Sequence, residues 1–374
     1  KRSNKIIGII LDACFVLADV KKIALYLWEE DKLVNKVFKG NIKGIRNYKV
    51  TEQTNRDQLY EKILKDIEER DEKAIFYKLA LKGKDIGVIY IINEIEENDD
   101  MEEANYETIS NLAMQVAIAL NNSIMYSELS IKERIAKELS IAANIQKNLL
   151  PKDTKLGFHI DLSEFFQPAK EIGGDYYDYN FIDDNSVFLT IGDVSGKGIP
   201  AALLMTSIRA TLKSLCYTYN SVDDMLIKLN NFMCKDMNDE MFVTIFHSHF
   251  DNNTKVLTYS NAGHNPLLVY RAREVRVEEE NVKGLAIGFS EGYKYKLGKI
   301  KLNEGDILLY YTDGVTEAEN KNKDLFGVER LKKVFLENSY KSAQQIKEEI
   351  LKEIEVFKEG HEQVDDITLL VVKI

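Results

Sequence analysis

The sequence has little cysteine, and its cysteines are scattered. Cys14, Cys216 and Cys234 are the only three in 374 residues, with no CxxC pair and no histidine at ligand spacing. Disulfide bridges and a structural zinc site are therefore not expected. This cysteine usage favours a reducing, cytoplasmic environment.

Long apolar runs are also missing. No stretch approaches the roughly 20 apolar residues of a membrane helix. The segment Ile6–Val16 is apolar, but it is short and contains Asp12. Because the chain starts at Lys1 rather than Met, we expect a fragment, and membrane attachment of a longer protein is left open.

Positive charge is in deficit. Lys and Arg number 50 and Asp and Glu number 61, which gives a formal charge of −11. Nucleic acid is therefore not an expected partner, because phosphate contacts need clustered basic residues. An acidic chain is compatible with cation binding.

What remains is a soluble globular composition, 45% hydrophobic and 30% charged, in a chain long enough for two domains. Residues 1–123 read as one α+β unit. Alternating apolar residues predict two hairpins there, and amphipathic periodicity predicts helices. The predicted strands are Lys22–Trp28, Leu33–Phe38, Ala74–Leu81 and Ile86–Ile92, and the predicted helices are Ile6–Ala18, Gln58–Glu69 and a long one from Glu107.

That last helix is predicted to continue as a linker over residues 124–151, where Pro151 ends it. Apolar residues separated by threes, fours and sevens fit a coiled-coil seam, with charged residues on the outer face. They are Ile124, Ile131, Ile135, Ala142, Ile145 and Leu149. The spacing predicts a homodimer, and a single surface helix packed on its own domain is the alternative.

Residues 152–374 combine strands with helices, which predicts an α+β layered domain. The predicted strands are Val187–Ile191, Phe242–Phe250, Val256–Ser260, Leu267–Tyr270, Ile307–Tyr311 and Ile367–Val372. The predicted helices are Pro200–Tyr217, Val222–Met237, Gly327–Glu337 and Ser342–Phe357.

Four segments of this region place Asp at an end of an apolar strand, usually beside Gly. They are GGDYYD (Gly173–Asp178), FLTIGDVSGKG (Phe188–Gly198), ILLYYTDG (Ile307–Gly314) and VDDITLLVV (Val364–Val372). Each alone is ordinary turn chemistry. Together they can converge on one edge of a sheet, where carboxylates repel unless a cation lies among them. Oxygen ligands select Mg²⁺ or Mn²⁺ over zinc.

These segments, with ELSIAANIQKNLLP (Glu138–Pro151), FVTIF, YSNAGHNP and GLAIG, occur in the order found in the PPM (protein phosphatase 2C-like) family. Residues 140–374 resemble its bacterial branch, the sporulation and stress-response phosphatases that act on sigma-factor regulators. The resemblance implies a sandwich of two packed β-sheets flanked by helices. It also implies metal-dependent hydrolysis of phosphoserine or phosphothreonine on a protein, here an anti-sigma-factor antagonist.

The resemblance also assigns the site. Asp175, Asp193, Asp313 and Asp365 match carboxylates that hold two Mn²⁺ or Mg²⁺ ions, and Val194 matches a residue that offers its backbone carbonyl. In the implied mechanism the two ions activate a water for in-line attack. Neighbouring carboxylates, Asp178 and Asp366, are expected to support these ligands.

Other polar residues near these motifs are weighed separately. The histidine that serves as general acid in many eukaryotic relatives is absent from GDVSGKG, which leaves protonation of the leaving group to water or to His264, although a structural loop role for His264 is preferred. Lys197 and Arg209 could clamp phosphate, but solvated surface roles are favoured for both. No CxxxxxR loop is present, which disfavours a thiolate mechanism.

Residues 1–123 resemble a GAF-type sensor domain, most clearly in the segment from Leu81 to Leu129. The resemblance implies a regulatory protein or a small ligand as its partner. A His-ligated haem is not expected, since residues 1–123 contain no histidine. Two alternatives to an active phosphatase remain: a catalytically silent module that signals by partner binding, and a cyclic-messenger enzyme, for which a GGDEF signature is lacking.

Overall fold

The computed structural model describes Asp12 and residues 22–29, 32–40, 47–49, 56–67, 72–81, 84–94, 102–151, 160–218, 221–237 and 241–374. Contacts divide the chain into two compact units, Lys1–Ile135 and Ala136–Ile374. The helix predicted for Ile6–Ala18 lies outside the described residues apart from Asp12. The predicted boundaries at 123 and 151 stay a prediction.

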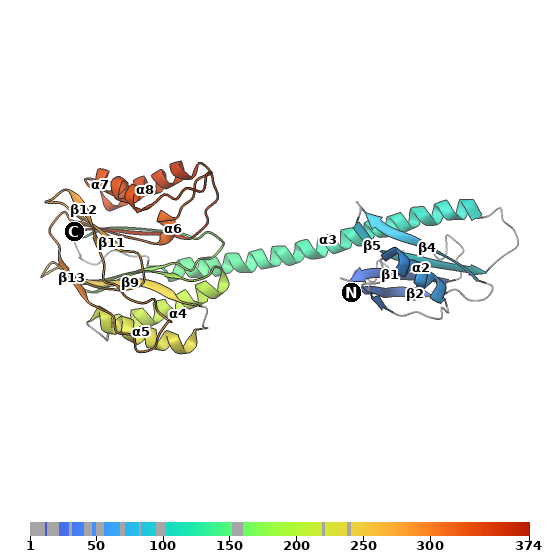
Figure 1. Ribbon diagram of the computed structural model, residues 1–374, viewed down its shortest axis with the longest axis horizontal. Helices are drawn as coiled ribbons and strands as arrows, with labels where there is room; N and C mark the ends of the chain where they lie inside the picture. The colour runs from blue at the N-terminus through green and yellow to red at the C-terminus, as the bar shows by residue number, and fades with distance from the viewer. Residues whose placement is uncertain are drawn as a thin grey trace. The chain divides into compact units, whose positions relative to one another are not determined.

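The first unit contains one antiparallel sheet of five strands, in the order β3-β2-β1-β5-β4 (Figure 1). The strands are β1 (Lys22–Glu29), β2 (Lys32–Lys39), β3 (Tyr48–Lys49), β4 (Glu72–Leu81) and β5 (Lys84–Glu94). Helix α2 (Arg56–Ile67) packs Leu59, Tyr60 and Ile63 against a cluster that includes Ala24, Tyr26, Val88 and Tyr90. Both predicted hairpins and the predicted helix are confirmed.

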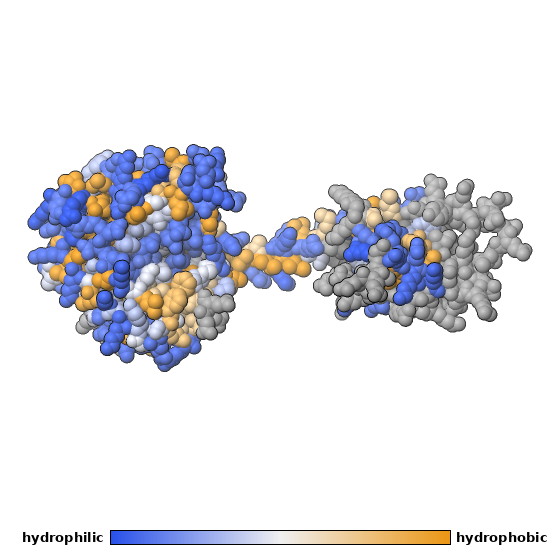
Figure 2. Space-filling view, in the orientation of Figure 1, coloured by the Kyte–Doolittle hydropathy of each residue, from blue (hydrophilic) through white to orange (hydrophobic). Residues whose placement is uncertain are grey.

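One continuous helix, α3 (Glu102–Leu149), follows and is 48 residues long. It begins five residues before the predicted start and ends two residues before Pro151. Several large apolar side chains on it are exposed, and Figure 2 shows them as orange side chains among blue ones. Of the helices that the structure describes, none combines the length and the apolar character needed to cross a membrane.

The second unit is a sandwich of two antiparallel five-stranded sheets, as predicted (Figure 1). The first sheet has the order β13-β10-β9-β8-β7 and the second β12-β11-β14-β15-β6. The strands are β6 (Asp161–Gln167), β7 (Tyr176–Asp183), β8 (Ser186–Val194), β9 (Val243–Asp251), β10 (Val256–Ala262), β11 (Leu267–Arg271), β12 (Arg276–Glu280), β13 (Gly298–Lys301), β14 (Ile307–Tyr311) and β15 (Ile367–Lys373).

Helices cover the outer face of each sheet. The first sheet carries α4 (Ile199–Cys216) and α5 (Val222–Asp236), and the second carries α7 (Val328–Glu337) and α8 (Ala343–Lys358). The short α6 (Asp313–Thr316) follows β14 directly. Each predicted strand and helix of this unit is present, with bounds that differ by at most three residues.

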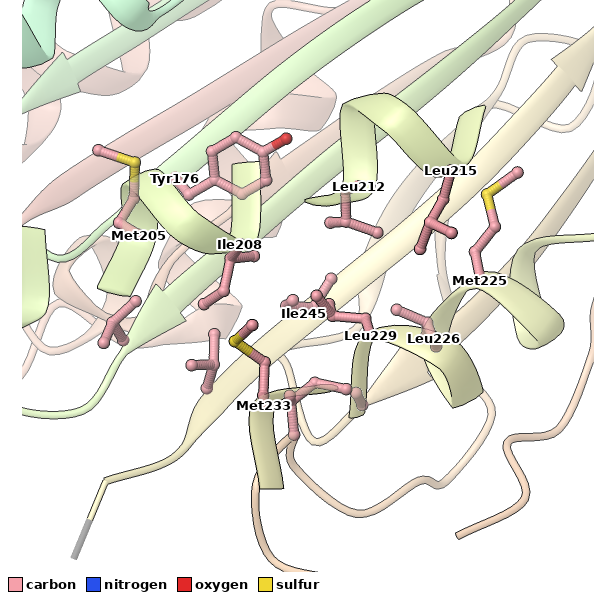
Figure 3. Packing of buried hydrophobic residues seen from close by; sticks show 14 of the residues in the cluster. Tyr176, Met205, Ile208, Leu212, Leu215, Met225, Leu226, Leu229, Met233 and Ile245 are labelled. Carbon is pink, nitrogen blue, oxygen red and sulfur yellow. The ribbon is translucent and has the colours of Figure 1, made fainter. Parts of the chain in front are cut away.

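Three apolar layers hold the sandwich together. The middle layer lies between the sheets and includes Phe246, Tyr310 and Leu370. The layer under α4 and α5 brings Met205, Ile208 and Leu229 against the strands (Figure 3). Because alternate residues of a strand face opposite sides, strands buried on both faces read as near-continuous apolar runs. The polar residues at the ends of these strands are left to form the site.

Candidate active site

The four Asp-bearing segments come together at one place in the second unit. A Cβ atom on Gly174 would lie 2.9 Å from the carbonyl oxygen of Val194, and one on Gly173 would lie 2.4 Å from Oδ2 of Asp366. A Cβ on Gly314 would lie 2.0 Å from the carbonyl oxygen of Asp366. Glycine is therefore required at these positions, because the turns carrying the carboxylates pass too close for any side chain.

Asp175 lies at the centre of the group and is fully buried. Its Oδ2 accepts hydrogen bonds from Oγ1 of Thr312 at 2.8 Å and from Oγ1 of Thr368 at 2.5 Å. The two threonines are themselves joined, because the Thr368 amide donates to Thr312 Oγ1 at 3.0 Å. Thr312 follows β14 and Thr368 is the second residue of β15, so two neighbouring strands of the second sheet fix one carboxylate. Sequence reasoning missed both threonines.

The carboxylates raise one another's pKa. Burial raises the pKa of Asp175 well above its ordinary value, and the charge of Asp193 adds to this. Burial, followed by the charges of Asp313 and Asp365, raises the pKa of Asp193 to about 7. The pKa of Asp313 is raised by burial and then by Glu317 and Asp365. A cation among these groups would relieve both the repulsion and the desolvation.

The donor chemistry suits a hard divalent cation. Asp175, Asp193, Asp313 and Asp365 offer carboxylate oxygens, and the Val194 carbonyl lies against the GGD turn. Mg²⁺ and Mn²⁺ prefer such oxygen ligands. Among the described residues, however, no group of three or more His, Cys, Asp or Glu side chains has the geometry of a complete metal site. The carboxylates interact electrostatically without converging on one point.

Asp366 organises the turn before Asp175. Its Oδ1 accepts a hydrogen bond from the Ala169 amide at 2.7 Å, and its Oδ2 accepts one from the Gly174 amide at 2.6 Å. The Asp175 amide lies 3.4 Å from the same Oδ2. Asp366 therefore joins two of the four segments through backbone amides.

Asp178 has different surroundings. Its contacts are with the Tyr176 hydroxyl, the Tyr179 amide and Arg209 of α4, whose Nε lies 3.4 Å from its Oδ2. These contacts do not join it to the carboxylates around Asp175. The surface role favoured for Arg209 was wrong: its side chain is 14% exposed and pairs with a buried carboxylate. The partner is 31 residues away, so no local pattern indicates the pair.

Lys197, for which a solvated surface role was favoured, is exposed, and it also contacts the candidate site. Its Nζ donates to the carbonyl of Val364 at 2.6 Å and lies 3.1 Å from Oδ2 of Asp365. Through Lys197, the GDVSGKG loop after β8 of the first sheet therefore contacts Asp365, a predicted metal ligand beside β15 of the second sheet.

The end of α3 contacts the same turn. Gln146 is buried, and its Nε2 donates to the carbonyl of Gly173 at 2.6 Å. Its Oε1 accepts from the Gly173 amide at 3.2 Å. One side chain therefore satisfies both backbone groups of the residue that begins the GGD turn.

His264 and Cys216 are both held in their neutral forms by burial. His264 donates from Nε2 to the Tyr311 carbonyl at 3.2 Å and accepts on Nδ1 from Thr244 Oγ1 at 2.8 Å. Burial lowers the pKa of His264 to about 4, so it is neutral at pH 7. Burial raises the pKa of Cys216 to about 12, which leaves its thiol protonated.

Comparison with known proteins adds a family. The family described as stage II sporulation protein E (SpoIIE) matches residues 183–374. That range contains Asp193, Asp313 and Asp365 but begins after Asp175.

Two curated relatives carry informative names. The phosphoserine phosphatase RsbU of Bacillus subtilis is 33% identical over 244 residues, which are 65% of this chain and 72% of the relative. The phosphoserine phosphatase RsbP of the same organism is 25% identical, over 64% of this chain and 58% of the relative. The match to RsbP therefore leaves a large part of that protein without a counterpart here.

Among solved structures, the SiaA-PP2C domain of Pseudomonas aeruginosa matches with a TM-score of 0.58 and 23% identity. The match covers 65% of this chain and 98% of that domain. At this identity the likeness shows the fold, which is that of a PP2C domain.

Proposed function

The chain belongs to the SpoIIE family of PP2C-like phosphatases, and from this membership we propose that it is a metal-dependent protein serine/threonine phosphatase. The observation that supports this most directly is the meeting of the four Asp-bearing segments around buried Asp175. Nothing in a purely structural role requires several buried carboxylates that raise one another's pKa.

Asp175, Asp193, Asp313, Asp365 and the Val194 carbonyl are the residues that we propose hold Mn²⁺ or Mg²⁺, with two ions in all. Bound divalent ions would supply activation of a water and neutralisation of phosphoryl charge.

The chain's own residues prepare this site. Thr312 and Thr368 hold one oxygen of Asp175, so the carboxylate is fixed in orientation before any ligand arrives. Asp366 fixes the turn from Ala169 to Asp175 through backbone amides. Such preorganisation lowers the cost of assembling the site. Neutral His264 is committed to two hydrogen bonds, which supports a structural role rather than proton donation.

The proposed substrate is a phosphorylated regulatory protein. Two relatives are named phosphoserine phosphatases, and the family branch predicted from the motifs acts on sigma-factor regulators. We therefore propose phosphoserine or phosphothreonine of an anti-sigma-factor antagonist as the target. The net charge of −11 argues against nucleic acid as a partner.

Regulation is proposed to come from the N-terminal unit. We propose that residues 1–123 act as a GAF-like sensor for a regulatory protein or a small ligand. Helix α3 is continuous from this unit to Leu149, and Gln146 near its end contacts the GGD turn. A shift of this helix would therefore move Gly173, which directly precedes Gly174 and Asp175.

The test is hydrolysis of a phosphoserine peptide with and without Mn²⁺, for the wild type beside Asp193→Asn. We expect Mn²⁺-dependent turnover in the wild type and a loss of at least about a hundredfold in the variant. Full turnover in Asp193→Asn would contradict the site assignment.

The alternative function is a catalytically silent module that signals by binding a partner. Calorimetric titration with Mn²⁺ separates the two. A chain that binds no Mn²⁺ and hydrolyses nothing is a silent module, whereas Mn²⁺ binding that Asp193→Asn abolishes supports the enzyme.

A further inference from the structure

Lys197 stands between two glycines in the loop that joins β8 to α4. It lies between Gly196 and Gly198, whose φ angles are +88° and +80°. A Cβ atom on either glycine would meet nothing within 4 Å. Glycine adopts such φ angles without strain, and open space therefore borders Lys197 on both sides.

The ammonium group of Lys197 is nevertheless placed at the candidate site. It donates to the Val364 carbonyl at 2.6 Å and lies 3.1 Å from Oδ2 of Asp365. The side chain remains 35% exposed, so the ammonium is partly hydrated. An ion pair of this kind is weak, since water competes with the carboxylate. Lys197 can therefore exchange Asp365 for another anion.

The charge of the site makes such an exchange useful. Asp175, Asp193, Asp313, Asp365 and Asp366 lie together, and a phosphate monoester adds further negative charge. Of the ion pairs among the described residues, Lys197–Asp365 is the one that brings a cation to any of these five carboxylates. A cationic side chain beside the proposed metal ions would further favour a phosphoryl group that enters this region.

We propose that Lys197 is a substrate-binding residue whose ammonium pairs with Asp365 in the free chain and moves to the phosphoryl oxygens of the substrate. A divalent cation on Asp365 would release the ammonium, so metal binding and phosphate binding become ordered. This inference rests on the proposed phosphatase function. It fits lysine, whose compact charge sits on a flexible four-carbon stem.

The test uses the full chain with Lys197→Gln and Lys197→Arg. Lys333→Gln is the matched control, because Lys333 is 73% exposed on α7 and pairs with Glu337 on the surface. Two quantities are measured for each: inhibition of Mn²⁺-dependent phosphopeptide turnover by inorganic phosphate, and Mn²⁺ affinity by calorimetry without phosphate.

For Lys197→Gln we expect the inhibition constant of phosphate and the KM to rise about tenfold or more. We expect Mn²⁺ affinity to stay unchanged or to tighten, because the competitor for Asp365 is gone. Lys197→Arg should recover part of the phosphate binding, and Lys333→Gln should match the wild type.

Weaker Mn²⁺ binding with unchanged phosphate inhibition would overturn the proposal, since Lys197 would then only hold Asp365 in place. If the wild type shows no turnover, the proposed function fails separately. Calorimetric titration of the Mn²⁺-loaded chain with inorganic phosphate then still decides the role of Lys197: equal affinity in the wild type and Lys197→Gln overturns it.

Discussion

At the scale of single residues, His264 links the strands that carry two of the carboxylates. Thr244, which donates to its Nδ1, is the register partner of Asp193 across β8 and β9. Tyr311, whose carbonyl accepts from its Nε2, is followed by Thr312 and Asp313. A neutral imidazole can make both contacts at once, whereas an imidazolium has no acceptor for the Thr244 hydroxyl.

His264 should therefore make the fold sensitive to acid. Its pKa is lowered to about 4 in the folded chain and is ordinary in the unfolded chain, so protons bind preferentially to the unfolded chain between about pH 6.5 and 4. Stability is fully present above that window and is lost as the pH falls through it, by about 2 kcal/mol at pH 5.

We expect His264→Gln to be less stable than the wild type at pH 7.5 but to lose about 2 kcal/mol less on going to pH 5. Urea unfolding at the two pH values measures this. The control is His361→Gln, in the turn after α8, where the ring contacts the carbonyl of its neighbour Glu362. An equal loss in His264→Gln and wild type would contradict the assignment.

The site residues that could be predicted from sequence are those with a local signature. Asp175, Asp193 and Asp313 each adjoin a glycine at the end or start of an apolar strand, so the turn chemistry marks them. Thr312 and Thr368 have no such mark, because a threonine beside a strand is ordinary β chemistry. The roles of Lys197 and Arg209 depend on partners 168 and 31 residues away, which only the fold brings near.

At the scale of elements, strands with a local sequence pattern were predicted, whereas strands defined by their pairing partners were not. Strands buried on both faces, such as β8 and β14, were predicted because their apolar runs are continuous. The four edge strands of the sandwich, β6, β7, β12 and β13, were missed. β12 reads RVEEE and β13 has four residues, and polar, short strands are typical of exposed sheet edges. Their pairing partners, not their composition, make them strands.

Gln146 gives the end of α3 a testable role. Gln146→Ala leaves a buried N–H and a buried carbonyl of Gly173 without partners, which costs about 2 kcal/mol. Because Gly173 begins the GGD turn, we also expect turnover to fall by about tenfold or more. Thermal unfolding and peptide hydrolysis measure the two effects.

The control for this variant is Asn144→Ala, an exposed residue of α3 two positions earlier. It should keep both stability and turnover. If Gln146→Ala behaves as this control does, the contact between α3 and the turn has no part in assembling the site.

At the scale of the whole molecule, the family was predictable because many short motifs occur in one order. No single Asp-Gly carries that information, but a fixed succession of them constrains the fold. The matched family range begins at residue 183, and the motifs before it, including GGDYYD, complete the site geometrically. The sensor identity of the first unit stays a prediction, since an antiparallel sheet packed against a helix is compatible with many functions.

The dimer stays a prediction at the scale of the whole molecule, and we propose that α3 supplies its surface. Ile131, Ile135 and Ile145 lie on the predicted seam, and each is about half exposed. Large aliphatic side chains repeated along one helix stabilise a chain when a second helix covers them, at about 25 cal/mol per Å² of buried apolar surface. We propose that the partner is a second copy of this chain.

Replacing Ile131 and Ile135 with Glu places like charges in that seam, and we expect the double variant to be monomeric at about 10 μM by light scattering while the wild type is dimeric. The control adds the same two negative charges off the seam, as Ser130→Glu with Ser140→Glu, two exposed neutral positions of the same helix. Because these positions face away from the seam in a heptad repeat, the control should stay dimeric. A wild type that is monomeric at high micromolar concentration would contradict the pairing. A control that dissociates as readily as the seam variant would show that the total charge of the helix, not the seam, governs association.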